Sequence, residues 1–320
     1  MGPAQSIKLF FGSKRLLSTA CSQRTISRAV SRSGFGLHTG TIAHLTLLPA
    51  AAGEGRYFVH LSKRGNLREE EVRVPASIQC LKETNLSTCI SQGNVKIRTI
   101  EHLLSALEGI GVHNCRIEVQ GGDEVPILDG SARLWVEAIH AAGLEFALDK
   151  EGNKVEHTTF SLMNPIHVTK ADSFIAAFPS PDLRITYGIE FKEVSAIGTQ
   201  VLCGSKVKEV IASMRAAGLI KGGSVENALI CSTNDGWLNP PLRFSDEPCR
   251  HKLLDLIGDL ALCAENGNSG LPNAHIVAFK AGHLLHTKFS YALLEAKEHQ
   301  RRKAIQTTSE RCNAYMQQVG

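Results

Sequence analysis

The sequence lacks the features that mark several large classes of protein. It contains no run of about eighteen uncharged apolar residues, the length that a membrane-spanning helix requires, so we expect no transmembrane segment. The nine cysteines are scattered and include no C-x-x-C pair, which disfavours a disulfide framework and a cysteine-based zinc site. With 43% apolar and 21% charged residues, the composition is that of a globular protein with room for two domains.

Familiar catalytic signatures are missing as well. The chain has no H-E-x-x-H metalloprotease motif, no G-x-S-x-G nucleophile elbow and no P-loop. The segment SGFGLHTG, residues 33–40, has the spacing G-x-G-x-x-x-G and precedes a predicted strand instead of opening a helix. A dinucleotide-binding loop needs a different spacing and a following helix, so we predict no dinucleotide site here.

Acidic residues are absent from the first 53 positions, which contain six lysines and arginines. Basic, serine-rich and acid-free segments are typical of organellar transit peptides. A secretory signal would need an uninterrupted apolar core, and the cations Lys14 and Arg15 interrupt this one. We therefore predict a transit peptide over residues 1–30, directed to the mitochondrion, with the plastid as the second choice.

The charge of the remaining chain argues against a nucleic-acid partner. Without the six N-terminal cations the formal net charge of +4 becomes −2. A nucleic-acid-binding surface needs a basic patch on the folded body, and no such patch is evident in the sequence. We expect a monomer that acts on a small-molecule substrate.

Hydrophobic periodicity divides the chain into two halves that each combine strands and helices. A polar run at 149–154 marks the boundary. We therefore place a first domain at 31–148, a second domain with an inserted helix at 155–300, and a tail at 301–320. Layers of strands and helices in both halves predict an α+β fold of two similar domains.

The expected elements follow from the apolar patterns and their flanking turn residues. In the first half we expect strands at 44–50, 56–62, 95–98 and 113–120 and helices at 99–109, with Thr99 as its N-cap, and at 132–143. In the second half we expect strands at 165–170, 173–179, 184–191, 226–232 and 274–280 and helices at 206–219, at 249–265 and from 282.

The helix expected at 249–265 carries polar residues at helical spacing. His251 and Asp255 lie four residues apart, so both side chains project from one face, and Asp259 follows one turn later. An imidazole and a carboxylate at this spacing can bind one zinc ion, and Lys252 lies beside them. The same spacing is common in surface pairs, so this motif alone does not establish a metal site.

A second pair of polar residues opens the helix expected at 99–109. Glu101 and His102 are adjacent in its first turn, and the inner face is otherwise leucine and isoleucine. At least one of the two must face inward and needs a partner there. A histidine ligand beside a carboxylate suits zinc-dependent hydrolysis, in which the carboxylate accepts a proton from water. A capping-turn pair without function is the alternative.

The last candidate follows the strand expected at 274–280. Gly282 and His283 open a helix there, and a glycine at a strand-to-helix turn lets a substrate approach the backbone. His283 could protonate a leaving amine. His286, one turn further along, is interpreted as a structural histidine.

Five segments together resemble a single family. SGFGLHTG, TIEHLLSALEGIGVHN, EVPILDGSA, RHKLLDLIGDL and HIVAFKAGHLLH occur in the order and approximate spacing of UDP-3-O-acyl-N-acetylglucosamine deacetylases. The resemblance extends from about residue 31 to about residue 286. It implies two α+β domains packed face to face with a zinc site in the cleft between them. The reaction it implies is removal of the N-acetyl group from UDP-3-O-acyl-N-acetylglucosamine, which gives UDP-3-O-acyl-glucosamine and acetate and commits the sugar nucleotide to lipid A synthesis.

The resemblance also implies roles for individual residues. The zinc ligands would be His102, His251 and Asp255, and iron is the alternative metal. Glu101 would be the general base and His283 the general acid. Asp259 would orient the ring of His283, and Lys252 would help to hold the tetrahedral intermediate. His38 lies in a family motif but receives no role.

One segment departs from the family. A Ser-x-Arg-Thr-Phe motif precedes the inserted helix of the second domain in the family, where its Thr assists the oxyanion and its Phe lines the acyl passage. Residues 188–220 contain no such motif, and the stretch at 198–206 is short. The part after about residue 288 also leaves the family pattern. The alternative reading is therefore a catalytically impaired relative that keeps the zinc site.

Overall fold

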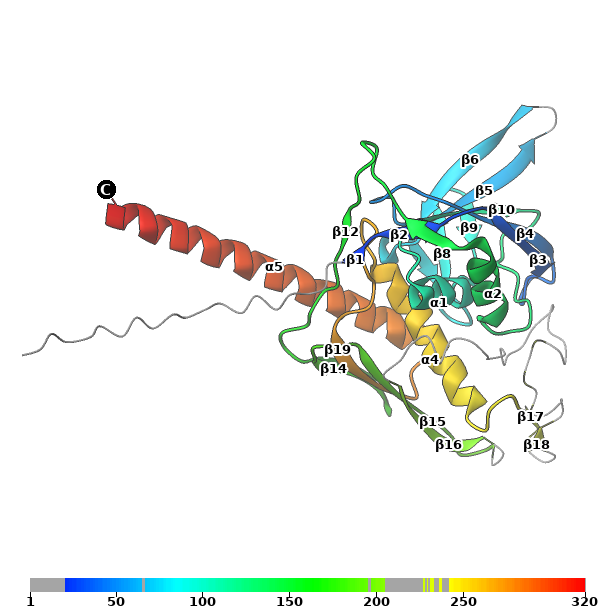
Figure 1. The fold of residues 1–320 in the computed structure, drawn as a ribbon. Coiled ribbons are helices and arrows are strands. Elements are labelled where there is room, and N and C mark those ends of the chain that lie inside the picture. Colours follow the sequence, from blue (N-terminus) through cyan, green and yellow to red (C-terminus); the bar gives the residue numbers. More distant parts are fainter. Residues whose placement is uncertain are drawn as a thin grey trace, which may run out of the picture.

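The structure is a computed structural model that describes residues 21–64, 67–194, 197–204, 227, 229, 231–232, 236–237 and 242–319. It combines helices and sheets, in agreement with the α+β prediction. Two five-stranded sheets lie on opposite sides of a group of helices (Figure 1).

The first sheet has one strand inserted between two hairpins. Its order is β3 (Val30–Phe35), β4 (Ile42–Leu48), β10 (Cys115–Gln120), β5 (Arg56–Arg64) and β6 (Leu67–Pro75). Only the β10–β5 pair is parallel, and its neighbours pair antiparallel. Apolar residues alternate along β4 and β10, so one face of this sheet is buried.

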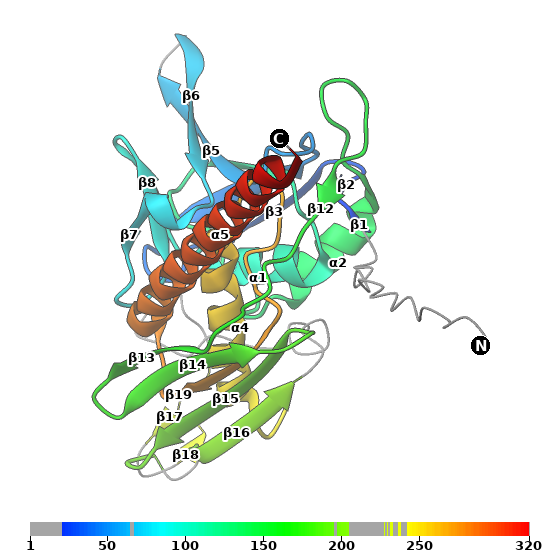
Figure 2. The ribbon, with the colours of Figure 1, turned by 90° about the vertical axis from the view of Figure 1, so that its left-hand side faces the viewer.

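The second sheet repeats this arrangement with later strands. Its order is β13 (Ile166–Lys170), β14 (Ser173–Pro179), β19 (Ala274–Phe279), β15 (Arg184–Phe191) and β16 (Gly198–Gly204). Again the inserted last strand, β19, makes the one parallel pair, with β15. In both sheets the order is first, second, fifth, third, fourth, although the sequence shows no repeat. Figure 2 shows this sheet from the side away from the central helices.

The helices occupy equivalent places in the two halves. α1 (Glu101–Ile110) precedes the inserted strand of the first sheet and α4 (Glu247–Leu260) that of the second, and α2 (Arg133–Ala142) and α5 (His283–Val319) follow them. α1 and α4 pack against each other. At their contact an added Cβ on Gly258 would overlap the carbonyl of Glu101, so only glycine permits this approach.

One continuous hydrophobic core lies between the sheets and includes residues from both halves. Representative members are Leu45, Ile117, Leu104, Leu107, Leu254, Ile257, Ile175 and Ile276. The halves therefore share the core that contains α1 and α4.

Smaller elements complete the fold. Three strand pairs are β1 (Cys21–Ser22) with β12 (Glu156–His157), β2 (Arg24–Ile26) with β11 (Leu144–Phe146), and β17 (Cys231–Ser232) with β18 (Gly236–Trp237). A three-stranded sheet consists of β7 (Leu81–Glu83), β8 (Cys89–Gln92) and β9 (Val95–Ile97). The 3-10 turns are η1 (Ile78–Cys80) and η2 (Ala261–Cys263).

The folded part begins earlier than the predicted boundary at residue 31. Residues 21–30, which the sequence analysis placed in the transit peptide, contain β1, β2 and the start of β3. Ile26 is fully buried, and Gln23 donates to the carbonyl of Asn266 at 2.9 Å. The partners of β1 and β2 are more than a hundred residues away, so local composition does not reveal these strands. Residues 1–20 lie outside the described residues.

The predicted N-cap of α1 is wrong. Thr99 has a positive φ of 55°, and its hydroxyl donates to Oε1 of the buried Glu124 at 2.7 Å. Ile100 occupies the N-cap position and makes no side-chain cap. A buried carboxylate needs donors, and Glu124 takes the hydroxyl that would otherwise have capped the helix.

The remaining differences concern the ends of the chain and the inserted segment. Residues 301–319, predicted as a tail, continue α5, which projects from the body in Figure 1. The helix expected at 206–219 lies outside the described residues, as do residues 226, 228 and 230 of the strand expected at 226–232, of which Cys231–Ser232 forms β17. Among the residues that the structure describes, none of the helices has the length and apolar character needed to cross a membrane.

Candidate active site

Three side chains from the two crossing helices converge near the centre of the molecule. His102 lies in the first turn of α1, and His251 and Asp255 lie one turn apart on α4. The Nε2 atoms of His102 and His251 are 3.7 and 3.5 Å from Oδ1 of Asp255. All three residues are buried, so these groups meet away from bulk water.

The separations suit metal ligands better than hydrogen-bonded partners. They exceed the usual N–H···O limit of about 3.2 Å, whereas two ligands about 2.05 Å from a tetrahedral zinc ion stand about 3.4 Å apart. Oδ1 of Asp255 is buried and has no hydrogen-bond partner among the described residues. Lys252 Nζ donates to Oδ2 of Asp255 at 2.9 Å, which leaves Oδ1 facing the two imidazoles. The residues present therefore fit a zinc ion.

The protonation states of these groups agree with that fit. Burial, followed by the charge of His251, lowers the pKa of His102 to about 3. Burial also lowers the pKa of His251. Burial acts to raise the pKa of Asp255, but the nearby imidazoles and Lys252 hold it well below its usual range. Two neutral imidazoles and a carboxylate are the forms that bind zinc.

Glu101 lies beside this cluster at the start of α1. It is 2% exposed, and its Oε2 accepts a hydrogen bond from the backbone N–H of Thr88 at 3.1 Å. Burial, with the charges of Asp259 and Asp255, raises the pKa of Glu101 to about 8, and His283 opposes the rise. A carboxyl group with this pKa is mostly protonated at neutral pH, and a positive charge beside it would favour the ionised form that accepts a proton.

A histidine and an aspartate face Glu101 from the second half. Nδ1 of His283, at the start of α5, lies 2.8 Å from Oδ2 of Asp259 on α4. Burial acts to lower the pKa of His283, but the charge and hydrogen bond of Asp259, with Asp255 and Glu101, raise it to about 9. Its Nε2 is 4.0 Å from Oε1 of Glu101. A protonated imidazole and a carboxyl group therefore stand on either side of a small gap.

Comparisons with known proteins show the family to which this chain belongs. Residues 23–295 match the family described as UDP-3-O-acyl N-acetylglycosamine deacetylase. An Arabidopsis thaliana relative named "Probable UDP-3-O-acyl-N-acetylglucosamine deacetylase 1, mitochondrial" is 46% identical over 288 residues, which cover 83% of this chain and 86% of the relative. UDP-3-O-acyl-N-acetylglucosamine deacetylases of Trichormus variabilis and Thermosynechococcus vestitus are each 41% identical, over 85% and 87% of this chain and 98% and 96% of theirs. The chain belongs to the UDP-3-O-acyl-N-acetylglucosamine deacetylase family.

Every residue that the sequence analysis placed in the deacetylase site lies in one buried or half-buried cluster. They are Glu101, His102, His251, Lys252, Asp255, Asp259 and His283. The pairing of Lys252 with Asp255 is a contact that the sequence analysis did not include.

The motif SGFGLHTG contains the end of β3 and the loop that follows it, which surrounds Glu124. The backbone N–H groups of His38 and Thr39 donate to the Glu124 carboxylate at 3.0 and 2.8 Å. An added Cβ on Gly36 would overlap this carboxylate and the hydroxyl of Thr39, which explains the glycine. The ring of His38 lines a cavity of about 250 Å³ together with Arg98. Glu124, which the sequence analysis gave no role, is therefore the anchor of this loop.

Thr88 is the residue of the site that sequence reasoning missed. Its backbone N–H binds Glu101, and its hydroxyl donates to Oδ1 of Asp259, so it joins the two carboxyl groups. It lies in the polar segment KETNLSTCI between β7 and β8, where nothing in the local pattern distinguishes it from its neighbours. Only the approach of the two halves reveals its role.

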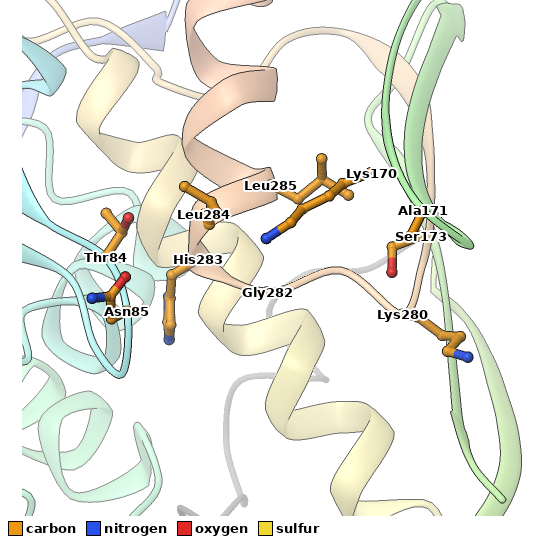
Figure 3. Close-up of a pocket in the computed structure, with 10 residues that line it drawn as sticks. All are labelled: Thr84, Asn85, Lys170, Ala171, Ser173, Lys280, Gly282, His283, Leu284 and Leu285. Carbon is orange, nitrogen blue, oxygen red and sulfur yellow. The ribbon is translucent and has the colours of Figure 1, made fainter.

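A cavity of about 400 Å³ opens beside His283 (Figure 3). Thr84 and Asn85 lie on one side of it, and Lys170 and Lys280 of the second sheet lie on the other. Gly282 also lines it, and a Cβ added there would meet no other atom within 4 Å. The cavity thus reaches the backbone next to His283, as the sequence analysis expected of Gly282.

Proposed function

We propose that this chain is a zinc-dependent deacetylase that hydrolyses the N-acetyl group of UDP-3-O-acyl-N-acetylglucosamine. The products are acetate and UDP-3-O-acyl-glucosamine, and the reaction is the committed step of lipid A biosynthesis. The observation that carries the proposal is the buried Oδ1 of Asp255, which has no hydrogen-bond partner among the described residues and faces Nε2 of His102 and of His251. A proton acceptor and a proton donor flank this group.

His102, His251 and Asp255 hold the metal in this proposal. When bound, Zn²⁺ supplies a Lewis acid next to the acetyl carbonyl and a positive charge that favours the ionised form of Glu101. One ligand comes from α1 and two come from α4, so in this proposal the bound metal joins the two halves of the molecule.

The proton transfers belong to the chain's own residues. Glu101 accepts a proton from the water that attacks the acetyl carbon, while the N–H of Thr88 holds its other oxygen. Nε2 of His283 donates a proton to the sugar nitrogen as the carbon–nitrogen bond breaks. Asp259 holds Nδ1 of His283 and keeps the opposite edge of the ring toward Glu101. Lys252 stabilises negative charge on the acetyl oxygen.

The cavity beside His283 accepts the substrate's diphosphate in this proposal. Lys170 is exposed at its rim, and Lys280 is held there by Glu190 at 3.3 Å and by Asp172. The exposed ammonium group of Lys170 suits a sugar nucleotide, in which the diphosphate lies beside the sugar, whereas the charge of Lys280 is balanced by its two carboxylates.

We further propose that the protein is directed to the mitochondrion. The relative from Arabidopsis thaliana carries that location in its name, and the N-terminal segment is basic and acid-free. Because β1 begins at Cys21, residues 1–20 are the part available as a targeting segment. A fusion of residues 1–20 to a fluorescent protein should enter mitochondria. Plastid import would change the compartment, and a cytosolic signal would refute targeting.

A second candidate function is that of a catalytically impaired zinc-binding relative. The absence of a Ser-x-Arg-Thr-Phe segment before residue 206 favours it, because loss of one oxyanion donor costs about 10²–10³ in rate. Inserting that segment ahead of residue 206 should then raise turnover without changing the metal content.

One experiment separates the two functions. Purified protein loaded with zinc is incubated with UDP-3-O-acyl-N-acetylglucosamine, and the released acetate and the bound metal are both measured. One zinc per chain with acetate release supports the deacetylase. One zinc per chain without acetate supports the impaired relative, and the absence of bound metal contradicts both.

A further inference from the structure

His286 is a buried imidazole one turn after His283, to which the sequence analysis gave only a structural role. It is 0% exposed, and its apolar neighbours on the same face of α5 include Leu285 and Phe289. Nδ1 of His286 lies 2.7 Å from Oδ2 of Asp259. On the other edge of the ring, Nε2 lies 3.1 Å from the hydroxyl of Tyr187.

The donors in this network can be assigned from chemistry. Burial acts to raise the pKa of Asp259, but the charge of His283 and the hydrogen bonds from His283 and His286 lower it to about 2. An ionised carboxylate only accepts hydrogen bonds, so Nδ1 carries the hydrogen in both His283 and His286. Burial also lowers the pKa of His286, which is therefore neutral, with Nε2 as an acceptor. The Tyr187 hydroxyl faces it and also donates to the carbonyl of Ala281 at 2.8 Å, so two acceptors share its one hydrogen.

Asp259 is consequently held from three directions. Oδ2 accepts from His283 at 2.8 Å and from His286 at 2.7 Å, and Oδ1 accepts from the Thr88 hydroxyl. The carboxylate cannot rotate without breaking at least one of these bonds. The two imidazole rings lie edge to face with centroids 5.8 Å apart, so Asp259 is the group that connects them.

We infer that His286 is a positioning residue, which holds Asp259 and through it fixes the ring of His283 with Nε2 toward Glu101. The inference rests on the proposed function, in which His283 is the proton donor. An apolar residue at position 286 would fill the core without the cost of burying an imidazole. The hydrogen-bonding atoms of His286 instead face Asp259 and Tyr187.

Two substitutions at position 286 test this role. In His286→Asn the amide nitrogen is two bonds from Cβ, as Nδ1 of the histidine is, so a donor to Asp259 remains. In His286→Leu this donor is lost. Removing a residue that orients a functional group typically costs about 10–100-fold. We therefore expect His286→Leu to lower kcat by that factor with KM and zinc content unchanged, and His286→Asn to stay within about 3-fold of the unsubstituted protein.

A spectroscopic readout makes the test independent of turnover. The Nδ1 proton of His283 should give a downfield proton NMR signal while Asp259 is held. The signal should persist in His286→Asn and be lost or shifted in His286→Leu. The matched control is Ser290→Ala, a fully buried residue on α5 whose hydroxyl donates to the carbonyl of His286 at 3.0 Å and makes no bond to Asp259 among the described residues. It should change neither kcat nor the signal.

The outcomes are distinct from those of the proposed function. If the unsubstituted protein binds zinc but releases no acetate, the deacetylase proposal fails, and the NMR comparison still tests the inference. If His286→Leu does not fold, His286→Gln replaces it, because its amide reaches the position of Nε2 and leaves Asp259 without the donor. Equal kcat and an unchanged signal in all variants, or an equal loss in Asn and Leu, would overturn the inference.

Discussion

The two halves of the molecule share one strand order but contribute unequally to the site. The first sheet and α1 supply Glu101 and His102. The second sheet, α4 and α5 supply the other two proposed ligands, the proposed proton donor and its aspartate. In both halves the proposed metal ligands lie on the helix that precedes the inserted strand. Equivalent helices of the two halves therefore cross at the site. The two halves have the same strand order, but each supplies different functional side chains.

The outer faces of the two sheets differ as well. On β4 and β10 of the first sheet, the residues that alternate with the core are mostly polar. They include His44, Thr46, Arg116, Glu118 and Gln120. The equivalent positions on β14 and β19 of the second sheet are mostly apolar. They include Phe174, Ala176, Phe178, Val277 and Phe279. The strand order of a sheet therefore does not determine the polarity of its outer face, because outward side chains do not have to pack in the core.

The largest expected effect is the loss of bound zinc when a single proposed ligand is replaced, in the first half or in the second. His102→Ala and His251→Ala should each abolish tight zinc binding, because neither half alone holds more than two of the three proposed ligands. Metal analysis of the purified variants measures this. A full equivalent of zinc in either variant would show that the halves are not both needed and that the ligand assignment is wrong.

Glu101→Ala should separate chemistry from metal binding within the first half. The variant removes a proton acceptor and no ligand, so zinc content should stay near that of the unsubstituted protein while turnover falls by about 10²–10⁴. Turnover and metal content are measured on the same preparation. A large loss of zinc would instead make Glu101 a ligand or a structural residue.

Gly258→Ala tests the contact between the equivalent helices. In an exposed helix this change would stabilise by about 0.5–1 kcal/mol. Here the new methyl group would meet the backbone of Glu101, and overpacking of this kind costs about 1–3 kcal/mol. The free energy of unfolding in urea gives the sign, and Gly282→Ala, which has open space around it, is the control for stability. Stabilisation by Gly258→Ala would refute the close approach.

The smallest effect concerns a histidine pair outside the site, between β2 and β12. The rings of His113 and His157 stack with centroids 3.9 Å apart, and Nδ1 of His113 accepts from the backbone N–H of Arg24. Burial, followed by the charges of His157 and Arg56, lowers the pKa of His113 to about 2. The pKa of His113 in the unfolded chain is about 6.5, so between that pH and about 2 only the unfolded chain protonates this histidine. The free energy of unfolding is therefore greatest above pH 6.5 and falls as the pH decreases.

The loss should approach about 1.4 kcal/mol for each pH unit below 6.5. Urea unfolding between pH 7 and pH 5 measures it. His113→Asn keeps an acceptor for Arg24 but does not titrate, so this variant should show a weaker pH dependence. Equal slopes for the two proteins would show that His113 does not contribute.

Much of the fold could be predicted because its elements have local patterns. The strands at 173–179 and 184–191 have the predicted bounds, and the helix expected at 132–143 ends at Gly143 as its sequence indicated. Thr99 was predicted wrongly because a residue twenty-five positions away takes its hydroxyl. The strands before residue 30 were missed because their partners lie beyond residue 140.

The sequence by itself determined which side chains could do chemistry and how those on one helix are arranged. His251, Asp255 and Asp259 share a face because α-helical geometry repeats every 3.6 residues or so, and no other part of the chain is needed for that. Only the tertiary structure decided that His102 meets them, that Thr88 joins Glu101 to Asp259, and that His286 holds the same carboxylate as His283. The first two contacts depend on the packing of α1 against α4 at Gly258, and the third on the packing of α5 against α4, where atoms far apart in sequence share the same buried space and hydrogen bonds.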